Sequence, residues 1–219
     1  MSLRIIFDLD GTLVHSVPSL CATGNRLLHE LGRAPVTPEA YVSFVGKGMR
    51  KQVEMLLEHT GGIPGELDTH FDRFRALYLE DPISRTTLYP DVSVTLNTLS
   101  KAGHRLGVCT QKNTAPAQMV LDSFALVPPI AALTAGDTLD VLKPDPRMLE
   151  HTAAQLGTGP LSDVVFIGDS QTDAQTADNA GVPFLLHANG YAHGPLKDMR
   201  AAAIFQSWDE VPGLIARLT

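Results

Sequence analysis

The chain has 219 residues, with 17 Lys and Arg against 24 Asp and Glu, and a formal net charge of −7. This acidic balance argues against a nucleic-acid partner, and no apolar stretch is long enough to cross a membrane. Asp8 comes too early for a secretory signal peptide, and two cysteines are too few for a disulfide framework. We therefore expect a cytoplasmic protein, large enough for one domain with an insertion.

A short apolar run from Leu3 to Phe7 precedes Asp8-Leu9-Asp10-Gly11-Thr12. The run is too short for a core helix and predicts a buried strand. Within a strand, Asp8 and Asp10 would point the same way. A turn at Gly11 would lift both to the strand's carboxyl end and leave the amides of Gly11 and Thr12 free to face an anion. Two neighbouring carboxylates repel each other, which calls for a cation such as Mg²⁺.

Helical spacing of apolar residues replaces the strand pattern in the next part of the chain. Helices are expected at 17–31, from Thr37-Pro38-Glu39 onward, at 49–59 and at 66–79. Gly46-Lys47-Gly48 would end the second of them. We therefore expect residues 16–82 to form an all-helical cap, inserted into a core made of residues 1–15 and 83–219.

Strands and helices alternate after Leu88. Strands are expected at 105–109, 130–134, 164–167, 183–187 and 203–205, and helices at 92–102, 114–124, 146–156, 171–180 and 210–218. Alternation with continuously apolar strands predicts an α/β fold, a doubly wound parallel sheet with a Rossmann-like core. Such sheets bind ligands at the carboxyl ends of their strands.

Polar residues stand at those ends. They are Asp8 and Asp10 after the first strand, Thr110 after the second, Lys143 after the third, and Asp169 with Asp173 after the fourth. A cation and a lysine would neutralise phosphate oxygens, and a hydroxyl would donate a hydrogen bond to them. One carboxylate can attack phosphorus, and a second can protonate the leaving alkoxide and then activate water. The set predicts phosphoryl transfer.

These residues resemble the haloacid dehalogenase superfamily of phosphatases over nearly the whole chain. Asp8-Leu9-Asp10-Gly11-Thr12 is similar to its first motif, Thr110 to its second, Lys143 to its third and Gly168-Asp169-Ser170-x-x-Asp173 to its fourth. A helical cap between the first two motifs is also a family pattern. The phosphoglycolate phosphatases are the most similar group within it. The segments that indicate this are Val45-Gly46-Lys47-Gly48, Tyr89-Pro90, Gly136-Asp137, Lys143-Pro144-x-Pro146 and Gly190-Tyr191-x-x-Gly194.

The resemblance implies Mg²⁺ as cofactor and a role for each carboxylate. Asp8 would be the nucleophile and a metal ligand. Asp10 would be the general acid and base, with its backbone carbonyl on the metal. Asp169 would be the third ligand, and Asp173 would act from a second layer or through water. Because the dehalogenases themselves lack the second aspartate, Asp10 indicates a phosphatase.

Thr110 and Lys143 would hold the phosphoryl group. The groups expected to bind substrate come from the motifs and from the glycine break in the cap: Gly11, Thr12, Gln111, Lys112, Lys47 and Arg50. The cap would close as a lid over the leaving group. Its basic residues could pair with the carboxylate of a small acid such as 2-phosphoglycolate.

Two residues depart from the family pattern beside the expected pocket. His15 stands where relatives usually carry Asp, and Gln111 where they usually carry Asn. Alternatives remain: a phosphatase for a sugar phosphate or pyrophosphate, or a non-catalytic signalling module phosphorylated on aspartate. The cap and Asp10 favour an enzyme, because a switch needs a persistent phosphoaspartate. The expected partner is a small phosphorylated metabolite, and the chain would be a monomer or a homodimer.

Overall fold

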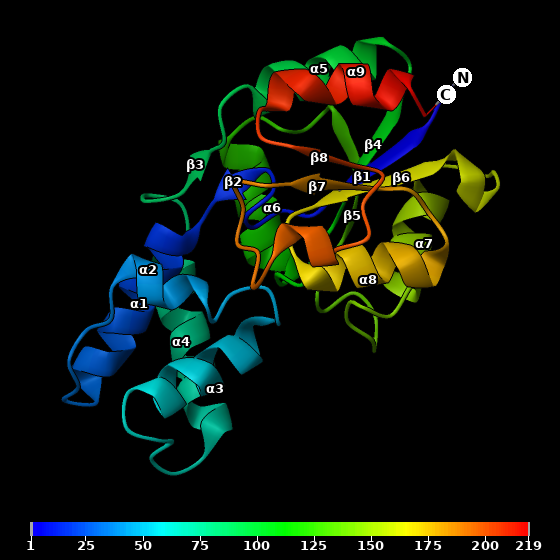
Figure 1. Cartoon of the computed structure of the whole chain (residues 1–219). Coiled ribbons are helices and arrows are strands. Elements are labelled where there is room, and N and C mark those ends of the chain that lie inside the picture. Colours follow the sequence, from blue (N-terminus) through cyan, green and yellow to red (C-terminus); the bar gives the residue numbers. More distant parts are fainter. Residues whose placement is uncertain (1, 219) are drawn as a thin grey trace.

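A computed structural model describes residues 2–218 and is built around one large parallel sheet (Figure 1). Its strands are β1 (Arg4–Phe7), β4 (Arg105–Cys109), β5 (Ile130–Thr134), β6 (Val164–Gly168), β7 (Phe184–His187) and β8 (Ala203–Phe205). The six strands lie in the order β5-β4-β1-β6-β7-β8. The chain builds outward from β1 on one side and then returns to its other side, so β1 has β4 and β6 as parallel neighbours.

Helices cover both faces of this sheet. α5 (Val92–Lys101), α6 (Thr114–Ser123) and α9 (Val211–Ala216) pack on one face, and α7 (Arg147–Gln155) and α8 (Gln171–Ala180) on the other. Strand β1 is buried along its whole length. Ile5 and Phe7 join the first apolar cluster and Ile6 the second, as alternating strand side chains must. The doubly wound, Rossmann-like fold is confirmed.

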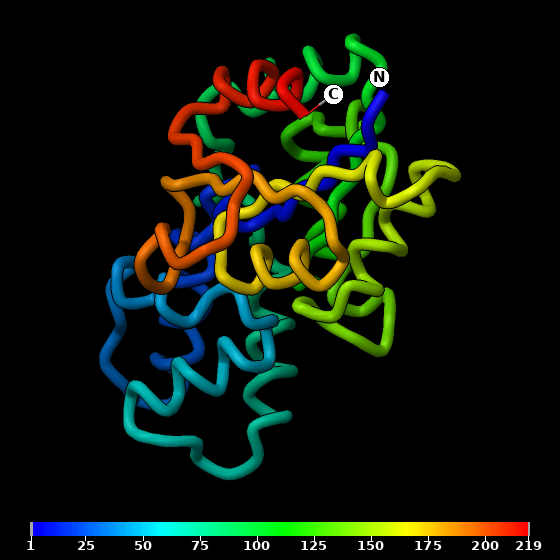
Figure 2. Tube along the Cα trace, turned by 45° about the vertical axis from the view of Figure 1, so that its right-hand side comes forward, coloured from blue at the N-terminus to red at the C-terminus, as the bar shows by residue number. Residues whose placement is uncertain are grey.

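The remaining helices form a separate lobe beside the sheet (Figures 1 and 2). They are α1 (Val17–Glu30), α2 (Pro38–Val42), α3 (Met49–His59) and α4 (Leu67–Glu80). This lobe has its own apolar centre, in which Tyr41, Phe74 and Tyr78 are fully buried. Among the described residues, Tyr191 is the member of that cluster that comes from outside the lobe. The inserted helical cap is therefore confirmed.

A two-stranded antiparallel ladder joins the lobe to the sheet. Strand β2 (Val14–His15) pairs with β3 (Thr87–Leu88), with His15 opposite Thr87. The chain therefore enters and leaves the cap at one point. The sequence did not predict these strands, because two residues carry no detectable alternation.

The second cap helix is shorter than expected. Thr37 accepts a hydrogen bond from the Ala40 amide at 3.3 Å, which confirms the predicted helix start. The helix ends at Val42, and Gly46 and Gly48 with φ of 94° and 82° lie in the loop before α3. Short 3₁₀ helices η1 (Leu161–Asp163), η2 (Leu196–Asp198) and η3 (Trp208–Glu210) complete the core. None of the described helices is long and apolar enough to span a membrane.

Candidate active site

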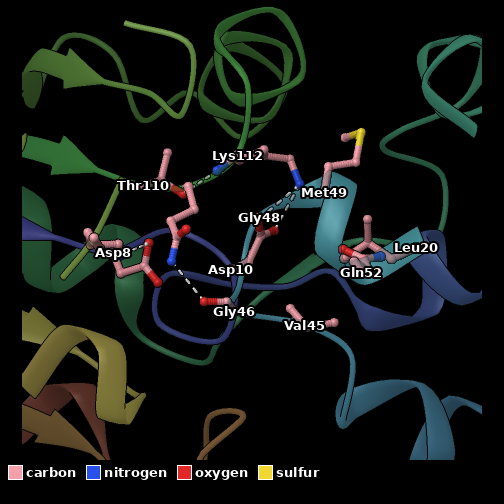
Figure 3. A pocket seen from close by; sticks show the side chains of 12 residues that line it. Asp8, Asp10, Leu20, Val45, Gly46, Gly48, Met49, Gln52, Thr110 and Lys112 are labelled. Atoms are coloured by element: carbon pink, nitrogen blue, oxygen red, sulfur yellow. Dashed lines mark hydrogen bonds and ion pairs between the residues drawn. The ribbon is translucent and has the colours of Figure 1, made fainter. Parts of the chain in front are cut away.

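The first two carboxylates follow strand β1 and do not belong to it. The strand ends at Phe7, so Asp8 is the first residue beyond it and Asp10 lies in the turn that follows. Both carboxylates therefore lie at the carboxyl end of the strand, as expected. They line the same cavity (Figure 3). The turn depends on Gly11, which has φ of 87° and where a Cβ would come within 2.3 Å of Asp169 Oδ2.

The amides of this turn are already used. The Gly11 amide donates to the Val14 carbonyl at 2.8 Å, and the Thr12 amide to the Leu9 carbonyl at 3.3 Å. The expectation that both would be free to face an anion was wrong, because the turn closes on itself through these bonds. The Thr12 hydroxyl instead donates to Asp169 Oδ1 at 2.7 Å. Gly11 and Thr12 therefore shape the turn and hold Asp169.

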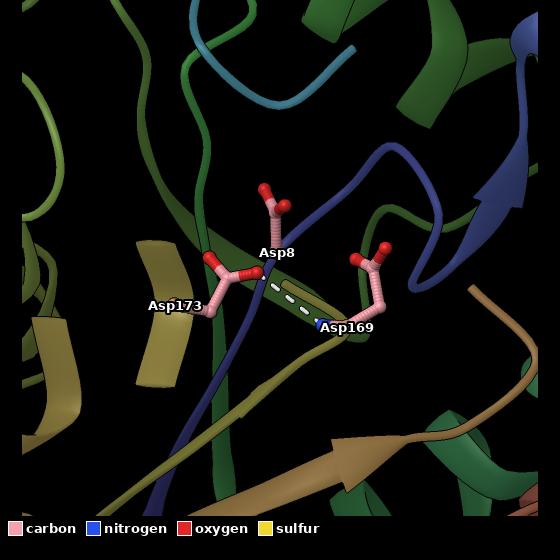
Figure 4. Close-up of side chains that lie close together, drawn as sticks. All are labelled: Asp8, Asp169 and Asp173. Carbon is pink, nitrogen blue, oxygen red and sulfur yellow. Dashed lines mark hydrogen bonds between the residues drawn. The ribbon is translucent and has the colours of Figure 1, made fainter. Parts of the chain in front are cut away.

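Three buried aspartates lie close together beside the cavity lining (Figure 4). Asp8, Asp169 and Asp173 each offer a carboxylate oxygen within 4.8 Å of the others. Burial raises the pKa of Asp8, and burial followed by repulsion from Asp173 and Asp8 raises the pKa of Asp169. Oδ1 of Asp8 accepts no hydrogen bond from any described residue. Such crowded, hard oxygen donors fit a divalent cation such as Mg²⁺.

Lys143 is the cation that the protein itself supplies to this cluster. Its Nζ lies 2.6 Å from Asp173 Oδ1 and 3.0 Å from Asp8 Oδ1, although the second contact lacks hydrogen-bond geometry. It also donates to the Cys109 carbonyl at 3.2 Å. Burial alone would lower the pKa of Lys143, but Asp173 and Asp8 together raise it. The buried ammonium therefore stays charged.

Asp173 lies in the first turn of α8 and accepts a hydrogen bond from Lys143 through Oδ1. Its Oδ2 accepts hydrogen bonds from the Ser170 amide at 3.1 Å, the Ser170 hydroxyl at 2.6 Å and the Asp169 amide at 3.3 Å. Ser170 in turn caps the helix by accepting from the Asp173 amide. Both oxygens of Asp173 thus have protein partners.

The segment after β4 reaches the first motif and the cap. Thr110 is buried, and its hydroxyl accepts a hydrogen bond from the Lys112 amide at 3.2 Å. Gln111 donates through Nε2 to the Gly46 carbonyl in the cap loop at 2.9 Å. The Nζ of Lys112 donates hydrogen bonds to both carboxylate oxygens of Asp10, at 3.0 and 3.1 Å. Because β4 pairs with β1, these groups meet Asp8 and Asp10 at one edge of the sheet.

The cap forms the opposite wall of the cavity. Its lining residues are Leu20, Val45, Gly46, Gly48, Met49 and Gln52. Gln52 is 5% exposed and donates through Nε2 to the Tyr41 hydroxyl at 2.7 Å. The cavity has a volume of about 40 Å³.

Two of the expected substrate-binding residues lie elsewhere. Lys47 and Arg50 line a neighbouring groove and not the cavity that holds Asp8 and Asp10. The Arg50 side chain forms an exposed ion pair with Asp68 at 2.9 Å. The structure therefore brings Asp8, Asp10, Thr110, Gln111, Lys112 and Lys143 together. It leaves Lys47 and Arg50, like Gly11 and Thr12, outside the cavity lining.

Sequence reasoning missed three residues of the site. Met49 and Gln52 lie on the buried face of α3, where apolar spacing indicates only packing. Tyr191 donates its amide to Asp169 Oδ2 at 2.6 Å, while its hydroxyl accepts from the amides of Ser16 and Val17 at the start of α1. Only the Gly190-Tyr191 resemblance pointed to it. His15, also in contact with that hydroxyl at 2.9 Å, belongs to the ladder.

Comparison with known proteins agrees with this geometry. Residues 5–187 match the family model of the haloacid dehalogenase-like hydrolases. The chain belongs to this family. A phosphoglycolate phosphatase of Cereibacter sphaeroides is 37% identical over 219 residues, with 98% of each chain covered. One of Rhodospirillum rubrum is 37% identical over 214 residues, covering 95% of this chain and 88% of the relative.

A solved structure from Haemophilus somnus, described as a predicted phosphoglycolate phosphatase, has the same fold. Its TM-score with this chain is 0.91 at 25% identity, and 98% of each chain is covered. This chain thus shares the hydrolase family and the fold, over core and cap, with its relatives.

Proposed function

We propose that this hydrolase is a Mg²⁺-dependent phosphomonoesterase that acts through an aspartyl-phosphate on 2-phosphoglycolate. The observation that carries the proposal is that Asp8, Asp10 and Lys143 line one cavity at the carboxyl end of the sheet. The phosphoglycolate phosphatases that match nearly the full chain support a phosphatase. A nucleophile, a proton donor and a fixed cation are the parts that phosphoryl transfer needs.

In the first step, a carboxylate oxygen of Asp8 forms a bond to phosphorus while the bond from phosphorus to the leaving-group oxygen breaks. Asp10, protonated, gives its proton to that oxygen, so the product leaves as an alcohol. Lys143 and Thr110 hold the phosphoryl oxygens, on which charge increases. The products of this step are the free alcohol and phosphorylated Asp8.

In the second step, water attacks the phosphorus of the aspartyl-phosphate, and the Asp10 carboxylate takes a proton from that water. The bond between phosphorus and the Asp8 oxygen breaks, which releases inorganic phosphate and restores both carboxyl groups. The position of Asp10 on the cavity supports an enzyme over a signalling module, because Asp10 is placed to remove the phosphoryl group.

The donor set supports a magnesium site made of Asp8, the backbone carbonyl of Asp10 and Asp169, with Asp173 acting through water. The last assignment follows from Lys143 and Ser170, which already occupy the oxygens of Asp173. When bound, Mg²⁺ would supply the positive charge that lets an anionic phosphate approach these carboxylates.

The phosphoglycolate phosphatases among the relatives support 2-phosphoglycolate over a sugar phosphate. Lys47 and Arg50, which line the neighbouring groove, would add positive potential that favours a substrate with a second anionic group. We further propose that residues 16–82 act as one cap unit, and that the chain works in the cytoplasm, where its two buried, free cysteines stay reduced.

A metabolite panel tests this function. The purified chain, with Mg²⁺, is offered 2-phosphoglycolate, neutral sugar phosphates and pyrophosphate, and phosphate release is measured. We expect 2-phosphoglycolate to have the highest kcat/KM. A tenfold advantage for neutral sugar phosphates would overturn the substrate and leave the phosphatase standing. Release from no phosphomonoester at all would overturn the phosphatase.

A further inference from the structure

Lys112 lies between the expected acid and base and a tyrosine of the cap. Its Nζ is 3.0 and 3.1 Å from the two carboxylate oxygens of Asp10 (Figure 3). On its other side, Nζ lies 4.9 Å from the ring centroid of Tyr78 in α4. The Lys112 side chain is 2% exposed and that of Asp10 is 15% exposed. A core lysine thus connects a core carboxylate to a cap ring.

This lysine is held as a cation. Burial alone would lower the pKa of Lys112, but Asp10 and then Tyr78 raise it above the ordinary value. The ring face of Tyr78 stabilises an ammonium that has been removed from water. The Tyr78 hydroxyl makes no hydrogen bond of regular geometry among residues 2–218, and Nζ of Lys112 lies over the ring. The ring face is therefore the main contact.

Asp10 lies in a turn beyond β1, where an isolated bridge to Val14 holds its backbone but leaves the orientation of its carboxylate to side-chain contacts. A proton donor must lie within hydrogen-bond reach of the leaving oxygen, and misplacement by about 1 Å can cost a hundredfold in rate. Two contacts from one Nζ fix the orientation of the carboxylate, and each oxygen keeps a second lone-pair site for the proton. One edge of Asp10 is then held, and the residue still faces the cavity.

We propose that Lys112 is a positioning residue that aims the Asp10 carboxylate at the leaving-group oxygen, and that the ring of Tyr78 holds Lys112 in place. This inference rests on the proposed function, in which Asp10 gives and takes the proton. It differs from the expectation that Lys112 binds the substrate directly. Both roles place Lys112 on the cavity wall, so only the pattern of losses across substrates separates them.

The chemistry predicts that pattern. An alkoxide must be protonated as it leaves, whereas p-nitrophenolate leaves without a proton. A misplaced Asp10 should therefore slow the attack of Asp8 on alkyl phosphates and spare the attack on p-nitrophenyl phosphate. Hydrolysis of the aspartyl-phosphate is common to both substrates, because both form the same intermediate. That second step should slow for both.

The test compares Lys112→Met with Lys101→Met, which removes an exposed lysine from α5. The substrates are ethyl phosphate, which carries no carboxylate, p-nitrophenyl phosphate and 2-phosphoglycolate. For Lys112→Met we expect kcat/KM to fall at least about tenfold for both alkyl substrates and less than about threefold for p-nitrophenyl phosphate. A burst of about one p-nitrophenolate per site should precede slow turnover. Lys101→Met should behave as wild type.

Three outcomes would overturn the inference. Equal losses of kcat/KM on ethyl and p-nitrophenyl phosphate would show a general defect. A loss confined to 2-phosphoglycolate would assign Lys112 to the substrate's carboxylate. Wild-type protein that hydrolyses none of the three would remove the proposed function, and the inference with it, before any variant is compared.

A double-mutant cycle with Asp10→Asn separates positioning of Asp10 from a general structural role of Lys112. Because Lys112 acts through Asp10, Lys112→Met should cost less than about threefold in p-nitrophenyl phosphate turnover when Asp10→Asn is already present. Losses that multiply would overturn the inference. Tyr78→Phe keeps the ring and should resemble wild type, whereas Tyr78→Leu should weakly reproduce Lys112→Met. If Tyr78→Leu does not fold, the Lys112 variants and the double-mutant cycle still test whether Lys112 positions Asp10.

Discussion

The two walls of the cavity are built in different ways. On the core wall, charged groups follow the parallel strands and are paired, as Lys143 is with Asp173 and Lys112 with Asp10. On the cap wall, the lining is largely apolar, and Gln52 supplies its one polar side chain among the described lining residues. Lys47 and Arg50 of the cap face a neighbouring groove and solvent.

This difference fits two tasks that the proposed function requires. A charge that stabilises a transferring phosphoryl group must be held still and away from water, where its electrostatic effect is large. Buried strand ends provide such positions. A wall that selects the leaving group needs shape and a few hydrogen bonds, which a packed helix can supply. We therefore expect substitutions on the core wall to lower kcat, and those on the cap wall to change KM modestly.

Asp8→Asn should have the largest effect. An amide is a poor nucleophile and a weaker ligand for Mg²⁺, and we expect turnover to fall at least about 10⁴-fold. Phosphate release by the purified variant measures this, with circular dichroism to confirm folding. Retention of a tenth of the activity, without deamidation back to Asp8, would remove it as the nucleophile.

Removal of Mg²⁺ should come next, and it tests the buried aspartates of the core wall. We expect excess chelator to lower turnover by about 10³-fold, because several kcal/mol of charge stabilisation would be lost. Ca²⁺ should inhibit, since larger ions accept bidentate carboxylates and would occupy the Asp8 oxygen that attacks phosphorus. Full activity in excess chelator would contradict the metal requirement.

Lys143→Met should lower kcat by about 10²–10³-fold, as is typical when one fixed electrostatic group is lost. It should also lower the free energy of unfolding by about 3 kcal/mol, because Asp173 and Asp8 would be buried without their cation. Steady-state kinetics and urea unfolding measure the two effects. An unchanged rate in folded protein would make Lys143 a structural residue only.

Gln52→Leu probes the cap wall. We expect KM for 2-phosphoglycolate to change by about fivefold, the value of roughly one hydrogen bond, with kcat nearly constant. Tyr41→Phe removes the partner of Gln52 without altering the lining and serves as the matched control. A hundredfold loss of kcat in Gln52→Leu would break the distinction between the walls.

Arg50→Ala and Lys47→Ala should have the smallest effect. Exposed charges at the rim are screened by salt, so we expect KM for 2-phosphoglycolate to rise about threefold at low ionic strength and little at high ionic strength. The KM for p-nitrophenyl phosphate should change less. A large increase that persists in salt would mean that the cap brings these residues into the cavity during turnover.

Much of this protein can be predicted from local sequence. The apolar runs at Arg105–Cys109 and Ile130–Thr134 became strands with the expected bounds, and α3 and α8 also kept theirs. Alternation of strands and helices then requires a parallel sheet, whose carboxyl ends bring Asp8, Thr110, Lys143 and Asp169 together. These features depend on periodicity and chain order, which the sequence carries directly.

Tertiary structure decided how each wall is completed. The Gly11 and Thr12 amides close a local turn on Val14 and Leu9. The Asp10 carboxylate, in contrast, is held by Lys112, which lies far away in the sequence. Whether Gln52 or Arg50 faces the cavity depends on how the cap packs on the core. That orientation rests on a ladder of two residues per strand and on the Tyr191 hydroxyl, neither of which leaves a periodic signal. Contacts of this kind become visible only in the folded chain.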